Sequence, residues 1–205
     1  SDNELNKPYD LLKKVSNWRR FYAVINAASV FMEKAPRTVE LDRSYSEQNL
    51  KYDIAQVRAL RAFAYFYMVR IWGDVPLVTY SYDNGTFPSM PRTDAQTVLS
   101  YAKAELLTAI EDLPYQYGTQ TNLYYGSYGA QWQGKLFNKL SAYSVLAHIC
   151  AWQGNYAEAE TYSAFIIDHA SEINAKYTSI ADLTSETGLF YSNASVKGSR
   201  ILGFN

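Results

Sequence analysis

One stretch, residues 44–73, constrains the fold more than any other part of the chain. Ser44 and Glu47 have the spacing of a capping box, in which a hydroxyl and a carboxylate satisfy the free amides of a helix start. Apolar residues then recur at three- and four-residue steps with further apolar residues between them, so we expect a helix buried on most sides. Gly73 and Pro76 end it, since glycine adopts the left-handed cap and proline cannot continue a helix. The sequence therefore predicts a central helix that other helices surround.

Further helical segments flank this one, and turn residues separate them. The predicted helices cover residues 8–34, 93–113, 135–153 and 156–169. Ala35-Pro36 should end the first, because the residue before a proline is pushed out of helical geometry. A second capping box from Thr93 to Gln96 should start the next, and Pro114 should end it. Between residues 77 and 91 we expect irregular chain with one short extended piece.

The last two predicted helices resemble a tetratricopeptide-type hairpin. Tyr143, the turn Gly154-Asn155, Tyr156 and Ala159 stand where that repeat has an aromatic residue, a turn, an aromatic residue and a small residue. The central helix and the 93–113 helix could form a second pair. Because such pairs bury a continuous core only by stacking, the sequence predicts an all-α superhelix of tetratricopeptide-like helix hairpins with irregular inserted loops.

The length of the chain predicts a single domain over residues 1–205. We expect a helical core at about 10–170 and an irregular extension over 171–205, where the helical signals weaken. The chain starts and stops without a clear boundary, which indicates a part of a longer protein.

Charge and cysteine content exclude several classes of function. The chain has 19 Lys+Arg against 20 Asp+Glu, and the basic residues are dispersed among acidic ones, so nucleic-acid binding is not expected. Cys150 is the only cysteine, which rules out an intrachain disulfide and predicts a small buried hydrophobe. The sequence has neither the apolar run of a membrane span nor the start of a signal peptide, so membrane contact is expected only through an anchor that this chain does not contain.

No constellation of residues predicts catalysis, a metal or a cofactor. Residues 129–135 have phosphate-loop spacing, but Leu136 stands where the magnesium-binding hydroxyl is needed. His148 and His169 are far apart and have no partner at ligand spacing. His148 fits a satisfied core or edge residue, and His169 fits a helix's last turn. A glycoside-hydrolysing pair of carboxylates remains a weak alternative, because the acidic residues are adjacent or lie on solvent-facing helices.

Two arginines on the central helix leave two interpretations open. Arg58 and Arg61 are three residues apart and could bond carbonyls or carboxylates of neighbouring segments. They could equally lie on a solvated face.

Aromatic residues make the main chemical signal that remains. The chain has 19 Tyr, 9 Phe and 4 Trp, and the polar stretch 115–134 interleaves several of these rings with amide side chains. A sugar ring lies against an aromatic plane, while its hydroxyls bond to amides. We therefore predict a glycan site in this loop, formed by Asn122, Tyr124, Tyr125, Tyr128 and Trp132. The same composition would also suit a protein–protein interface.

Three stretches resemble the SusD/RagB family of outer-membrane glycan-binding lipoproteins. The most specific is Val57-Arg58-Ala59-Leu60-Arg61-Ala62 with its exit Gly73-Asp74-Val75-Pro76-Leu77. Phe21 to Ala28 is similar to the family's Ile-Asn-containing helix. Residues 91–114 and 142–159 follow the family's order of helices, so the resemblance covers residues 18–170.

The resemblance implies a non-enzymatic, surface-facing component of a nutrient importer, anchored by lipid in the outer membrane. Its implied partners are an oligosaccharide or polysaccharide and a SusC-like TonB-dependent porin, over which it would sit as a lid. The family's lipidated cysteine is absent from this chain, and the family's glycan-contacting aromatics generally come from segments before residue 18 and after residue 205. The alternative function is a generic tetratricopeptide-like protein interaction module without glycan binding.

Overall fold

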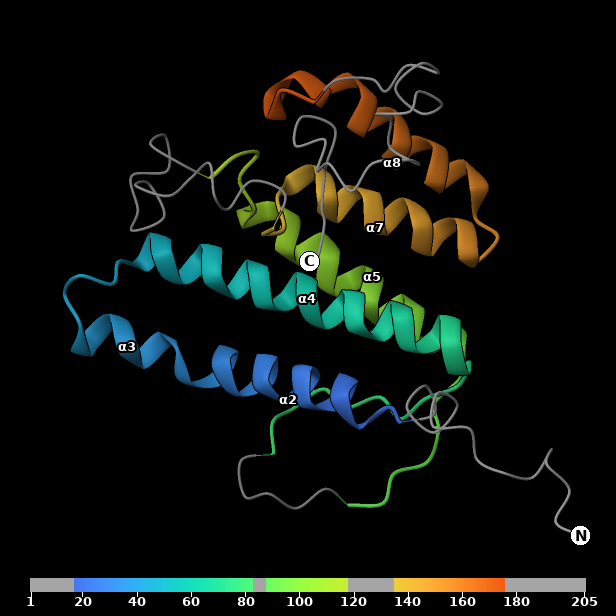
Figure 1. Cartoon of the computed structure of the whole chain (residues 1–205), viewed down its shortest axis with the longest axis horizontal. Coiled ribbons are helices and arrows are strands. Elements are labelled where there is room, and N and C mark those ends of the chain that lie inside the picture. The colour runs from blue at the N-terminus through green and yellow to red at the C-terminus, as the bar shows by residue number, and fades with distance from the viewer. Residues whose placement is uncertain (1–16, 83–87, 118–134, 176–205) are drawn as a thin grey trace, which may run out of the picture.

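The computed structural model describes residues 17–82, 88–117 and 135–175, and these residues confirm the predicted all-α class (Figure 1). The α-helices are α2 (Arg19–Lys34), α3 (Pro36–Leu41), α4 (Glu47–Trp72), α5 (Ala95–Asp112), α7 (Lys139–Trp152) and α8 (Tyr156–Asp168). A 3-10 turn, η4 (Ala170–Ile173), follows α8. Within the described ranges, strand-like pairing is limited to one isolated bridge between Val75 and Thr93.

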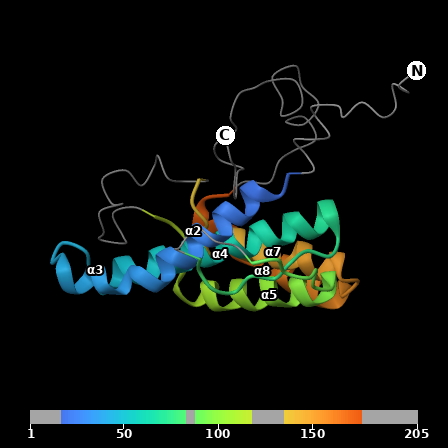
Figure 2. The ribbon, with the colours of Figure 1, turned by 90° about the horizontal axis from the view of Figure 1, so that it is seen from below.

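The helices pack side by side in a stack. Extensive contacts join α2 to α4, α4 to α5, α5 to α7, and α7 to α8. Both views show α4 between α2 and α5 (Figures 1 and 2), which is the central position predicted for it. The α7–α8 pair is the predicted hairpin, and its turn contains Gly154 at a φ of 82°. Cys150, on α7, is buried as expected.

The core explains why α4 is apolar on nearly every side. Tyr65 and Met68 are fully buried on α4, Leu99 and Leu106 on α5, and Leu146 on α7. These side chains belong to one continuous hydrophobic cluster that runs through the stack. Burial of each large apolar side chain contributes about 2 kcal/mol. Stacking the hairpins therefore removes from water surfaces that no single hairpin could cover.

The exact helix starts differ from the predicted ones. Ser46, and not Ser44, caps α4, because its side chain accepts a hydrogen bond from the Asn49 amide. Asp94, and not Thr93, caps α5 in the same way. Helix α7 starts at Lys139, four residues later than predicted, because Asn138 begins a capping box there.

Helix α2 ends at Lys34, as predicted, but the expectation that Ala35 leaves helical geometry is wrong. Ala35 has helical dihedral angles, with φ −58° and ψ −35°, and its amide still donates to the Phe31 carbonyl. Pro36 occupies the first position of α3, where a helix needs no amide hydrogen and where proline's fixed φ suits helical geometry. The chain therefore enters a second short helix instead of an irregular segment.

The insertion after α4 is held against α2 and α4 by side chains. Tyr22 Oη donates to the Pro76 carbonyl over 2.7 Å, and Tyr65 Oη bonds both the amide and the carbonyl of Val78 at 2.8 Å. Asn26 bonds both the amide and the carbonyl of Tyr82. The extended piece expected near residues 77–80 is thus fixed by side chains and not by a sheet.

Candidate functional site

All the residues predicted to bind glycan fall between positions 118 and 134. Asn122, Tyr124, Tyr125, Tyr128 and Trp132 therefore lie outside the described residues. The structure does describe the two ends of this loop, at residues 115–117 and 135–138. We call these two ends the loop base. Their contacts show which helices the loop is attached to.

Gln56 of α4 joins both ends of the loop. Its Nε2 donates to Tyr117 Oη and to the Phe137 carbonyl, and its Oε1 accepts from the Phe137 amide over 2.9 Å. The Tyr117 ring also packs edge-on against Tyr52, with centroids 6.1 Å apart. Burial raises the pKa of Tyr117, so its hydroxyl stays protonated. One amide side chain thus fixes residues that stand 61 and 81 positions away in sequence.

Tyr115 is also an anchor. Its ring stacks on His169, the residue that follows α8, with centroids 5.9 Å apart and planes 7° apart, and Lys139 Nζ lies 5.5 Å from the ring centroid. The Lys139 amide donates to the Pro114 carbonyl over 2.9 Å, which brings the two ends of the loop together. Tyr115 and Tyr117 both belong to the aromatic stretch 115–134, but their rings pack against the helices and attach the ends of this stretch to them.

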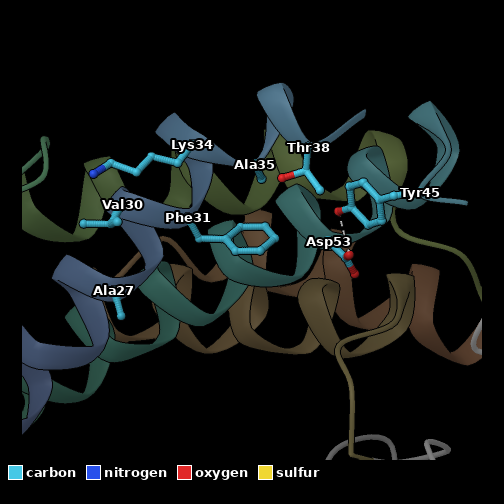
Figure 3. A pocket seen from close by; sticks show the side chains of 8 residues that line it. All are labelled: Ala27, Val30, Phe31, Lys34, Ala35, Thr38, Tyr45 and Asp53. Carbon is cyan, nitrogen blue, oxygen red and sulfur yellow. Dashed lines mark hydrogen bonds between the residues drawn. The ribbon is translucent and has the colours of Figure 1, made fainter. Parts of the chain in front are cut away.

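A pocket of about 670 Å³ opens between α2, α3 and α4 (Figure 3). It is lined by Ala27, Val30, Phe31, Lys34, Ala35, Thr38, Tyr45 and Asp53. Tyr45 Oη donates to Asp53 Oδ2 over 2.8 Å, and the Phe31 ring is 37% exposed. Asp53 is one turn of α4 before Gln56, so the pocket and the loop base share the first half of this helix.

The pocket combines an aromatic ring with polar groups, and that combination can hold a polyhydroxylated ligand. Its volume lies within the range of small-molecule sites, about 300–1,000 Å³. Phe31 offers a ring face for C–H groups, while Thr38 and Asp53 offer oxygen atoms that can bond hydroxyls. This pocket was not predicted from the sequence. The spacing of Ala27, Val30 and Phe31 along one side of α2 is the only signal for it in the sequence.

The described residues show no metal or membrane-spanning element. No three His, Cys, Asp or Glu side chains gather as a metal site in the ranges that the structure covers. None of the described helices has the length and apolar character needed to cross a bilayer. His148 is exposed on α7, and His169 ends α8 with its Nδ1 2.9 Å from the Phe165 carbonyl. These positions match the edge and helix-end roles predicted for the two histidines.

Stacked helix hairpins with irregular insertions define the chain as a tetratricopeptide-like helical-repeat protein. Comparison with known proteins shows which members of this class the chain is similar to. No family model matches the chain. A SusD-like protein of Formosa agariphila is 30% identical over 147 residues, which is 70% of this chain and 24% of that protein.

Solved structures show the same fold. A laminarin-binding SusD-like protein superposes with a TM-score of 0.62 at 23% identity, over 85% of this chain and 35% of its own. A structure solved with xylogluco-oligosaccharide superposes with a TM-score of 0.61 at 23% identity, over 81% of this chain and 31% of its own. The chain is SusD-like in sequence and in fold, so the predicted resemblance to the SusD/RagB family is confirmed. It spans about a quarter of the length of the curated relative and about a third of the solved chains.

Proposed function

We propose that this chain is the helical part of a non-enzymatic glycan-binding protein that captures oligosaccharide at the bacterial surface. The observation that carries this proposal is the 30% identity to a SusD-like protein over 70% of the chain. The laminarin-binding and xylogluco-oligosaccharide structures share its fold and support a sugar as the ligand. Residues 1–205 would form a single helical-repeat domain within a longer protein.

The location and the partner follow from the family and complete the proposal. The full-length protein would be a lipoprotein on the outer face of the outer membrane. It would deliver its glycan to a SusC-like TonB-dependent porin, as one component of nutrient uptake. The stacked hairpins would serve as the scaffold, and no catalytic residue or cofactor would be needed.

Within the chain, we propose that the glycan contacts the 118–134 loop through Tyr124, Tyr125, Tyr128, Trp132 and Asn122. The described base supports this role, because Gln56 and the stacked Tyr115 tie the loop to three helices. A recognition loop needs such a rigid support to hold its rings in place. The pocket beside Phe31 and Asp53 would offer a second contact on the same half of α4.

Calorimetric titration with laminarin- and xyloglucan-derived oligosaccharides tests the proposal. Trp132→Ala and Tyr125→Ala should each weaken binding by about fivefold or more, because losing a stacked ring removes roughly 1–3 kcal/mol. Phe31→Ala reports on the pocket. Tyr156→Ala is the matched control, because this tyrosine is 73% exposed on α8 and far in sequence from the loop.

The pattern of losses decides between the alternatives. Binding that depends on Trp132 and Tyr125 but not on Tyr156 supports the loop site. Binding that depends on Phe31 alone would move the site to the pocket. If the chain and a full-length version both fail to bind any oligosaccharide, the chain is a protein interaction module and the proposal is wrong.

A further inference from the structure

An exposed group of rings and one arginine lies where α4 and α7 end. Arg70, in the last turn of α4, has its guanidinium carbon 5.3 Å from the Tyr67 ring, 5.4 Å from the Phe66 ring and 5.5 Å from the Trp152 ring. Phe66 is buried. Tyr67 and Trp152 are 38% and 52% exposed. We call Tyr67, Arg70 and Trp152 the arginine–tryptophan patch.

This patch lies far from the loop base. Arg70 follows Gln56 by 14 positions on one continuous helix, which separates them by about 21 Å along its axis. Figure 1 shows the ends of α4 and α7 on the side of the stack away from the start of α4. The patch is therefore separate from the described base of the 118–134 loop.

The charge of Arg70 has no counterpart within the described chain. Its guanidinium contacts aromatic rings, and no carboxylate among the described residues forms an ion pair with it. The nearby Asp74 is engaged elsewhere, since its Oδ1 accepts the Ala95 amide at the start of α5. The rings hold the guanidinium by cation–π attraction and leave its N–H groups available to an incoming anion.

A second pair of the same kind adds to the positive charge at this end of the stack. The guanidinium carbon of Arg92 lies 5.3 Å from the Trp18 ring, and Trp18 packs edge-on against Trp72, two positions after Arg70. Three of the chain's four tryptophans thus lie around the end of α4 or beside it.

We propose that the arginine–tryptophan patch is a subsite for an acidic sugar unit, one that carries a carboxylate or a sulfate. The fork of Arg70 binds the anionic group, and Trp152 and Tyr67 contact the C–H surface of the sugar ring. This inference rests on the proposed glycan-binding function and narrows it, because it assigns the chain a preference for anionic glycans.

The size of the patch favours a sugar over a protein. A stable protein interface covers about 800 Å² on each partner, with 20–30 residues a side. The patch consists of one guanidinium and two exposed rings, each within 6 Å of it, and this matches one or two sugar rings. An acidic peptide is the competing ligand, since it would use the same arginine.

The test compares tetragalacturonate with its fully methyl-esterified form, which has the same rings without charge. We expect the acid to bind at least about tenfold more tightly than the ester, as a charge-assisted bidentate pair requires. Arg70→Gln should remove this difference, and Trp152→Ala should weaken both ligands. Arg37→Gln is the matched control, because Arg37 is an exposed arginine on α3. Circular dichroism of each variant checks that the helices are intact.

Three outcomes would overturn the inference: equal binding of acid and ester, an equal loss in the Arg37 control, or a tetraglutamate peptide binding through Arg70 as tightly as the sugar acid. Neutral laminarin oligosaccharides separate this result from the general proposal. If these oligosaccharides bind through Trp132 while Arg70 does not increase the affinity for tetragalacturonate, the glycan-binding function stands and the proposed acidic subsite is wrong. If no sugar binds at all, both are wrong.

Discussion

At the scale of single residues, the Glu105 carboxylate is the counterion of two arginines inside the stack. Arg58 Nη1 donates to Glu105 Oε1 over 2.8 Å, and Arg61 Nε donates to Glu105 Oε2 over 3.0 Å. Arg61 Nη1 also donates to Ser29 Oγ over 2.9 Å, so the network joins α2, α4 and α5. Arg61 and Glu105 are buried, while the Arg58 side chain is 27% exposed. Of the two interpretations left open by the sequence, the structure thus supports bonding to a carboxylate.

This network predicts unequal losses of stability. Glu105→Gln should lower the free energy of unfolding by about 3 kcal/mol, because it leaves the buried Arg61 charge without a counterion. Arg58→Gln should lower it by less than about 1 kcal/mol, since a partly exposed ion pair is weak. Urea denaturation at neutral pH measures both. Equal losses from the two substitutions would contradict the central role of Glu105.

Glu158 gives the stack a sensitivity to acid. Lys103 Nζ lies 2.5 Å from its carboxylate, and Tyr162 Oη donates to it over 2.9 Å, which links α5 to α8. The hydrogen bond from Lys103, followed by that from Tyr162, lowers the pKa of Glu158. A carboxyl whose pKa is lower in the folded state binds protons more readily when unfolded, so it stabilises the fold above its unfolded pKa. That stabilisation is lost as the pH falls through the folded pKa.

We therefore expect the stability advantage of the native chain over Glu158→Gln to be complete at neutral pH and to disappear in acid. The window starts near pH 4, the ordinary range for a glutamate, and extends below it. Thermal unfolding between pH 3 and pH 7 measures the difference. Glu160→Gln is the control, because Glu160 is an exposed glutamate on the same helix. A difference that stays constant over this pH range would show that the ion pair has no role in stability.

At the scale of helices and loops, the Gln56 side chain attaches both ends of the 118–134 loop to α4. Gln56→Leu keeps the volume but leaves the amide and carbonyl of the buried Phe137 without this partner. We expect a loss of about 1–3 kcal/mol in the free energy of unfolding, the cost of leaving buried polar groups unpaired. Binding of neutral oligosaccharides by the loop should weaken as well, because its base is no longer fixed.

Chemical denaturation and calorimetry on the same variant measure these two effects. Gln48→Leu provides the control, since Gln48 is an exposed glutamine in the first turn of α4. If Gln56→Leu leaves both stability and glycan affinity within the range of the control, the amide is not a structural link between the ends of the loop.

The longer helices were predictable because each carries its own periodic pattern and its own breaker, whereas the six-residue α3 was not predicted. The residues at which the longer helices start were harder to predict, because neighbouring side chains compete to form the capping hydrogen bond. Ser44, chosen as a cap, instead donates its amide and hydroxyl to Asp42, and this leaves Ser46 to cap α4. Asp94 replaces Thr93 as the cap of α5, one residue later. When two possible capping residues lie one or two positions apart, the sequence alone does not show which of them caps the helix.

The candidate sites were less predictable than the helices. Composition pointed to the 115–134 loop, but it could not separate anchoring rings such as Tyr115 and Tyr117 from rings available to a ligand. The pocket unites Phe31 with Asp53, and the patch unites Arg70 with Trp152. Each pair comes from different helices, so only tertiary packing brings it together. Periodicity along one helix contains no information on such contacts.

At the scale of the whole molecule, the stack predicts a gradient of local stability. Helices α4 and α5 have neighbours on two sides, whereas α8 packs on α7 at the edge of the described stack. Ten residues of α4 and seven of α5 are buried, while Ala159 is the one buried residue on α8. In stacked hairpins each unit is stabilised mainly by its neighbours, so an edge helix opens more easily than an inner one.

Native-state hydrogen exchange should therefore show the slowest amides in α4 and α5 and clearly faster ones in α8. Leu106→Ala, in the inner layer, should lower the free energy of unfolding by about 2–5 kcal/mol and speed up exchange throughout the stack, because a buried leucine leaves a cavity. Ile167→Ala is the edge control, since this side chain is 56% exposed, and it should change exchange only within α8. Equal exchange rates in α5 and α8 would mean that the described helices open as one unit. Local opening of α8 would then play no part in exchange, and the linear order of contacts would not govern stability.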